Sequence, residues 1–71
     1  MNVKMKKTKK HIGIVLKKLR LQKGSEPSEV AYILGMKAKY YKAIEMGRGS
    51  LLLSQAIKLT EYYCVSLDIF C

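Results

Sequence analysis

The sequence predicts a small all-α domain made of five short helices. Apolar residues recur with helical spacing between residues 10 and 23 and again between residues 52 and 63. Proline and glycine interrupt the stretch between these two segments in a pattern that leaves room for two further short helices. No segment alternates apolar and polar residues over the length of a strand. At 71 residues and 49% hydrophobic composition, the chain is expected to form one domain with a small core.

The first helix is expected over residues 10–23, after a basic arm. Residues 1–9 contain four lysines and no apolar period, so we interpret them as a flexible arm, either a solvated tail or a segment that follows phosphates. In the helix, the inward-facing residues lie at i, i+3, i+4 and i+7: Ile12, Val15, Leu16 and Leu19. Gly24 follows the basic Lys23, which is a typical helix end.

Two helices joined by a tight turn at Gly35 are expected over residues 27–46. Pro27 suits the first position of a helix, because the N–H that proline lacks would have no partner there. In the second helix, near residues 37–46, Tyr41 and Ile44 share one face and are predicted to be buried. The residues predicted to face outward include three lysines and no acid: Lys37, Lys39, Tyr40, Lys42 and Ala43. This arrangement is a helix-turn-helix unit, whose second helix can enter the major groove of DNA.

The C-terminal part is expected to hold a fourth helix and a final helical turn. An exposed turn over residues 47–50 precedes the fourth helix, which is predicted over residues 52–63. Its predicted inward face consists of Leu53, Ala56, Ile57, Thr60 and Tyr63. Ser66 is a suitable N-cap for a last turn or helix over residues 67–71.

The charge of the chain predicts an anionic partner, with nucleic acid ahead of a membrane surface or an acidic protein. Fourteen Lys and Arg residues face five Asp and Glu residues, for a net charge of +9, and nine of the basic residues precede residue 25. The two cysteines, Cys64 and Cys71, are too few for a disulfide scaffold and fit a reducing cytoplasm. We expect no metal, no cofactor and no membrane span, and with one histidine and no phosphate loop we expect no enzyme activity.

Several short motifs resemble the phage-repressor (Cro-type, XRE-like) helix-turn-helix DNA-binding family. They are Leu16-Lys17-Lys18-Leu19-Arg20, Lys23-Gly24, Glu29-Val30-Ala31, Leu34-Gly35, Ile44-Glu45-Met46-Gly47-Arg48 and Val65-Ser66-Leu67-Asp68. The similarity covers roughly residues 10–70, and it implies a lambda-repressor-like DNA-binding domain over residues 10–71, with the helix-turn-helix at about 27–46. It also implies an ion pair between Arg20 and Glu45, because a half-buried carboxylate needs a partner and a guanidinium can bind it with two hydrogen bonds.

The resemblance implies two sets of DNA contacts. The positions that match base-reading residues are Lys37, Ala38, Lys39, Tyr40, Lys42 and Ala43. Backbone contacts are expected from Lys10, Ser28, Arg48, Gly49 and Ser50. The sequence departs from the family at Pro27, where relatives have a glutamine that touches a phosphate, and it lacks the bidentate base readers Arg, Asn and Gln at the recognition positions.

We therefore expect a sequence-specific DNA-binding transcription regulator, a repressor, that places its third helix in the major groove of double-stranded DNA. It would act in the cytoplasm of a bacterium or be encoded by a phage. A homodimer is expected, because one such unit reads few base pairs; the candidate interface residues are Leu51, Leu52, Tyr62, Ile69 and Phe70. Two alternatives remain: a protein-interaction module on the same fold with weak DNA readout, and a non-specific architectural DNA binder.

Overall fold

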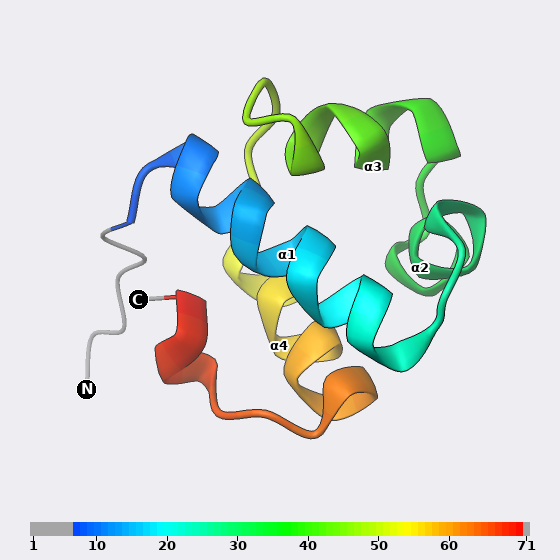
Figure 1. Cartoon of the computed structure of the whole chain (residues 1–71). Coiled ribbons are helices and arrows are strands. Elements are labelled where there is room, and N and C mark those ends of the chain that lie inside the picture. Colours follow the sequence, from blue (N-terminus) through cyan, green and yellow to red (C-terminus); the bar gives the residue numbers. More distant parts are fainter. Residues whose placement is uncertain (1–6, 71) are drawn as a thin grey trace.

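The predicted all-helical architecture is confirmed by the computed structural model, which describes residues 7–70 (Figure 1). Four α-helices and one 3-10 helix follow one another, with no strand among the described residues: α1 (Lys9–Lys23), α2 (Pro27–Leu34), α3 (Ala38–Glu45), α4 (Leu53–Tyr63) and η1 (Leu67–Phe70). In Figure 1, α3 and α4 lie on opposite sides of α1, and α2 connects the far end of α1 to α3. The helix-turn-helix unit is thus α2 and α3, held on α1.

Helix α1 begins one residue earlier than predicted. Thr8 is its N-cap, and the Thr8 hydroxyl accepts a hydrogen bond from the His11 amide at 3.1 Å. The Lys7 ammonium donates to the Ile69 carbonyl oxygen at 3.1 Å, which ties the start of α1 to η1. The domain therefore begins within the segment predicted to be an arm. Residues 1–6 of that arm, and Cys71 at the other end, lie outside the described residues.

The core confirms the faces predicted for the first and third helices. Buried side chains come from every helix: Ile12, Leu16, Leu19, Val30, Ala31, Leu34, Tyr41, Ile44, Leu51, Ala56, Leu59 and Phe70. Val15 is half-buried and packs against this cluster. Tyr41 and Ile44 are both buried, so α3 presents one face to the core and leaves the other free. Helices of eight residues are unstable alone in water, so this packing is what keeps α3 folded and oriented.

The inward face predicted for α4 is partly wrong. Ala56 and Leu59 are buried, whereas Leu53 is 39% exposed and Ile57 is 45% exposed. Apolar residues occur on more than one side of α4, so their spacing fits two faces almost equally well. The core selects the face that Ala56 and Leu59 share with Tyr63, at i, i+3 and i+7, because this face lets α4 pack closely against the rest of the bundle.

Two of the five candidate dimer residues are also wrong. Leu51 is 6% exposed and Phe70 is fully buried, and both belong to the core of this same chain. Leu51 precedes α4 and Phe70 ends η1, so neither position is governed by the helical period from which inward faces were predicted.

Ser66 does act at the start of η1 as predicted, since its hydroxyl accepts a hydrogen bond from the Asp68 amide at 3.3 Å.

Gly13 allows α1 to approach the end of α3 unusually closely. A Cβ added to Gly13 would lie 2.7 Å from the Ile44 carbonyl oxygen and still nearer to the Glu45 carbonyl oxygen. The same interface continues at Gly47, where a Cβ would lie 3.0 Å from the Cα of Lys10. Backbone therefore packs on backbone where the N-terminal half of α1 crosses the end of α3.

We expect Gly13→Ala to destabilise the fold. In an exposed helix the same change stabilises by up to about 1 kcal/mol through helix propensity. Here the added methyl overlaps two carbonyl oxygens, and such overpacking costs about 1–3 kcal/mol. Urea unfolding of both proteins measures the difference in the free energy of unfolding, with Gln22→Ala on the exposed side of α1 as the control. An unchanged or increased stability of Gly13→Ala would contradict the close packing.

Candidate nucleic-acid interface

The turn between α2 and α3 fixes the orientation of α3. Gly35 has φ 69°, a left-handed conformation that glycine adopts at little cost, and it ends α2. The Met36 amide donates to the Ala31 carbonyl oxygen at 3.0 Å, which closes the turn. Lys37 then serves as the N-cap of α3 in an extended conformation. At the start of α3, Lys37, Lys39 and Tyr40 are exposed, whereas Ala38 packs against the core.

Four of the six predicted base-contact positions are exposed together on α3. These are Lys37, Lys39, Tyr40 and Lys42. Ala38 and Ala43 are half-buried, and Ala38 packs against the core, so they can offer only small apolar contacts. The Lys39 ammonium lies 5.1 Å from the centroid of the Tyr40 ring, which places a cation over an aromatic face on the same surface.

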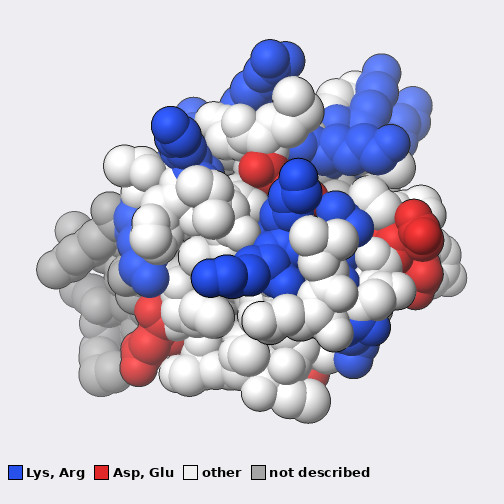
Figure 2. Space-filling model, viewed as in Figure 1, with Lys and Arg blue, Asp and Glu red and all other residues white. Residues whose placement is uncertain are grey.

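The outer face of α3 is basic and has no exposed carboxylate. Lys37 and Lys39 stand at the N-terminal end of α3, where the helix dipole already provides partial positive charge. No acidic residue in the first turn of α3 offsets them. Figure 2 shows that lysine and arginine gather over α3 and along the front of α1, whereas most of the acidic side chains in this view lie toward its edges. This surface is therefore suited to a polyanion.

The ion pair between Arg20 and Glu45, implied by the resemblance, is confirmed. Arg20 Nε donates to Glu45 Oε2 at 2.7 Å, and Arg20 Nη2 donates to Glu45 Oε1 at 3.2 Å. Arg20 Nη1 also donates to the Ser25 carbonyl oxygen at 3.1 Å, in the turn after α1. The hydrogen bonds that Arg20 donates to Glu45 raise the pKa of Arg20 above its ordinary value. Glu45 is thus occupied inside the protein and adds little negative charge to the outer face of α3.

Most of the predicted backbone contacts lie at one end of α3. Lys10, in the first turn of α1, lies beside Gly47, and Arg48 and Ser50 are exposed after α3. The amide of Gly49, which was predicted to face a phosphate, is used inside the protein, because it donates to the Ala43 carbonyl oxygen at 3.3 Å. Ser28 is exposed on the first turn of α2 and stands apart from this group.

The structure adds Lys17 to the basic surface. Lys17 and Lys42 line a hollow of about 260 Å³ with Arg20, Pro27, Glu45 and Met46. Lys17 precedes Arg20 by three residues, so the two share a face of α1. Because the resemblance already implied a pair between Arg20 and Glu45 of α3, this spacing could have identified Lys17 as a neighbour of α3. Pro27 lines the same hollow, so the two lysines supply charge beside the start of α2.

Two tyrosine hydroxyls are buried beside the ion pair. Among the described residues, the hydroxyls of Tyr41 and Tyr63 are the buried side-chain oxygens without a hydrogen-bond partner. Burial raises the pKa of Tyr41 well above its ordinary value of 10.0, and the nearby Glu45 adds to this effect. Burial also raises the pKa of Tyr63 to about 12. Both phenols therefore stay protonated to a higher pH than an exposed tyrosine does.

The described part of the chain offers neither a metal-binding cluster nor a membrane-spanning helix. Within residues 7–70, no group of three or more His, Cys, Asp or Glu residues could hold a metal ion. In the same range, no helix has the length and apolar character needed to cross a membrane. The basic face of α3 remains the principal candidate for a binding surface.

Two solved structures share this fold. The restriction-modification controller protein C.AhdI from Aeromonas hydrophila is 22% identical, over 89% of this chain and 96% of that chain, with a TM-score of 0.77. A hypothetical transcription factor from Neisseria, NHTF, is 19% identical, over 100% of this chain and 83% of that chain, with a TM-score of 0.76. No protein-family model and no curated protein match the chain. The two likenesses establish the phage-repressor-like helix-turn-helix fold that the sequence motifs implied.

We expect the protein to lose stability as the pH rises above 10. In the unfolded chain a tyrosine releases its proton near pH 10, whereas Tyr41 and Tyr63 in the folded chain keep theirs. Above pH 10 the folded chain therefore binds more protons than the unfolded chain, and the free energy of unfolding falls as the pH rises. One such group contributes a slope of up to about 1.4 kcal/mol per pH unit. Urea unfolding between pH 9 and pH 11.5 should show a shallower decline for Tyr41→Phe than for the native chain. Equal slopes would mean that Tyr41 is not buried as described.

Proposed function

We propose that this protein is a sequence-specific DNA-binding transcription regulator, a repressor, that places α3 in the major groove. The observation that carries this proposal is the exposed face of α3, which presents three lysines and Tyr40. In helix-turn-helix proteins, the residues at the N-terminal end of the recognition helix contact base edges. Lysine can donate to guanine, and the methyl groups of Ala38 and Ala43 can touch thymine methyl groups.

The charges on either side of α3 support the same docking. Lys17 lies beside Lys42 near the start of α2, and Lys10, Arg48 and Ser50 lie at the end of α3. Phosphates flank a helix in the major groove along its length, so basic side chains on both sides would fix its register. The names of the two neighbours, a controller protein and a transcription factor, favour a regulator over an enzyme. A regulator of this kind would act in the cytoplasm, where its DNA lies.

A homodimer would extend the contact to a second half-site. Leu52, Leu53 and Ile57 form an exposed apolar group at the start of α4, with exposures of 59%, 39% and 45%. Of the earlier candidates, Leu52 belongs to this group, and Ile69 and Tyr62 are half-buried. Helix α4 and α3 lie on opposite sides of α1 (Figure 1), so a second copy bound at α4 would leave α3 free for DNA.

Selection of DNA fragments from a bacterial genome at physiological salt, against excess random competitor, tests this function. One enriched inverted repeat is the expected result, and its half-site spacing of about one helical turn would reflect a symmetric dimer. Retention of DNA without a shared sequence would instead indicate an architectural binder, which the lack of Arg, Asn and Gln on α3 favours as second candidate. No retention would indicate a protein-interaction module.

We expect Lys39→Ala and Lys42→Ala to weaken binding to the selected site by roughly tenfold each. Each change removes one cation from the surface that would face DNA. Lys58→Ala is the matched control, since Lys58 is also exposed but lies on α4. Fluorescence anisotropy over a series of salt concentrations measures the affinity and its salt dependence. If Lys58→Ala weakens binding as much as the α3 variants, the contact is not made by α3.

A further inference from the structure

We propose that the hollow between α2 and α4 binds an arginine side chain presented by a basic segment of a partner protein. The hollow has a volume of about 420 Å³ and is lined by Ser28, Glu29, Tyr32, Ile33 and Tyr62. The hollow is largely open to solvent, so a side chain presented from outside can reach it. The site is separate from the outer face of α3 and shares only Ser28 with the expected DNA contacts. Its proposed ligand is a cation rather than DNA.

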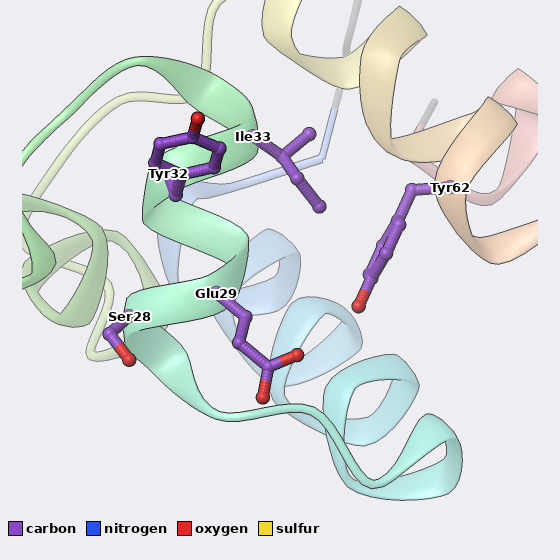
Figure 3. A pocket seen from close by; sticks show the side chains of 5 residues that line it. All are labelled: Ser28, Glu29, Tyr32, Ile33 and Tyr62. Atoms are coloured by element: carbon purple, nitrogen blue, oxygen red, sulfur yellow. The ribbon is translucent and has the colours of Figure 1, made fainter.

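The side chains of the hollow combine an apolar wall with one carboxylate. Figure 3 shows Ile33 of α2 and Tyr62 of α4 projecting toward the space between the two helices, with the Glu29 carboxylate near the tyrosine hydroxyl end. Neither lysine nor arginine lines the hollow, although the chain has fourteen of these residues. A ligand with an apolar stem and a positive head therefore matches the site, and its charge is complementary to the carboxylate.

Glu29 has the capacity to bind such a head group. Its Oε1 accepts a hydrogen bond from the Glu26 amide at 3.3 Å, which is long for a carboxylate acceptor. Within residues 7–70, the salt bridge between Arg20 and Glu45 is the only one, so Glu29 has no cationic partner there. Glu26 is exposed three residues earlier and adds a second negative charge near the hollow.

Tyr62 is already oriented and already attracts a cation. Its hydroxyl shares a hydrogen bond of 2.7 Å with the Ser25 hydroxyl, which fixes the ring. The Lys23 ammonium lies 4.6 Å from the centroid of this ring, but Lys23 does not line the hollow. The ring therefore has a surface toward the hollow that Lys23 does not cover. Arginine suits it better than lysine, because a planar guanidinium can stack on an aromatic ring while it pairs with a carboxylate.

Tyr32 provides a reason to expect a macromolecular partner rather than a free ion. It is 87% exposed at the rim of the hollow, the most exposed of the large apolar side chains in the described range. Exposed aromatic rings beside a concave site are typical of protein interfaces. A segment that inserts an arginine next to Glu29 would cover the Tyr32 ring with its neighbouring residues.

Titration of the ¹⁵N-labelled protein with N-acetyl-arginine-methylamide, followed by ¹H–¹⁵N NMR, tests this site directly. We expect saturable shifts of the amides of Glu29, Ile33 and Tyr62, and much smaller shifts with the neutral citrulline analogue. Glu29→Gln should weaken the binding of the arginine probe by about fivefold, since it removes the paired charge. Asp68→Asn is the matched control, because it removes an exposed carboxylate that does not line the hollow.

Three results would overturn the proposal. These are equal shifts with the arginine and citrulline probes, shifts spread over all acidic residues, and unchanged binding by Glu29→Gln. The result is independent of the DNA experiments, since Glu29→Gln should select the same DNA fragments as the native chain. A failure of DNA binding would leave the arginine titration interpretable, and the reverse also holds.

Discussion

The guanidinium group of Arg20 joins the end of α3 to the turn before α2, and the arrangement of the helices depends on this link. It binds both carboxylate oxygens of Glu45 at the end of α3 and the Ser25 carbonyl in the turn before α2. The Ser25 hydroxyl in turn is hydrogen-bonded to Tyr62 of α4. One side chain of α1 is thereby linked directly to α3, and through Ser25 to α4 and to the turn that leads into α2. Removing one partner from a buried pair of this kind leaves an uncompensated charge and is more costly than the pair is stabilising.

The same ion pair connects stability to the proposed function. Glu45 is the one acidic residue between Glu29 and Glu61, and an exposed carboxylate there would repel a phosphate backbone. Its burial against Arg20 leaves the lysines of α3 as the dominant charges on that surface. The lysines at the N-terminal end of α3 are unfavourable for the helix dipole. Packing of Tyr41 and Ile44 offsets this local cost and holds the helix in place.

Sequence patterns predicted the parts of the structure that depend on local chemistry. Proline at the start of α2, glycine at its end and the spacing of Tyr41 and Ile44 each follow from backbone geometry, so these predictions are confirmed. The ion pair of Arg20 and Glu45 came from the family resemblance and is also confirmed. The inward face of α4 was only partly predicted because apolar residues lie on more than one side of that helix. Leu51 and Phe70 were misplaced because their burial depends on contacts outside a helical period.

The spacing of residue types in the sequence could not predict contacts between backbone segments. Gly13 lies in the middle of α1, where a glycine weakens a helix, and nothing in the sequence says which element approaches it. The Gly49 amide was expected to contact the DNA backbone because of its place after the recognition helix, but the fold directs it to the Ala43 carbonyl. Lys17, in contrast, could have been predicted. It lies three residues before Arg20 and therefore on the same face of α1, near α3.

Helix α2 has a role in both proposed surfaces, and its geometry keeps them compatible. Pro27 at its start lies with Lys17 and Lys42 in the basic hollow beside α3. Glu29 and Ile33, on another face, line the hollow toward α4. Residues four apart on a helix share a face, whereas Pro27 and Glu29 are two apart and point in different directions. A polyanion on one side and a basic protein segment on the other would therefore approach α2 from different directions. Their charges would attract rather than repel each other, so a partner at the acidic hollow would not oppose DNA binding and could strengthen it through its own basic residues.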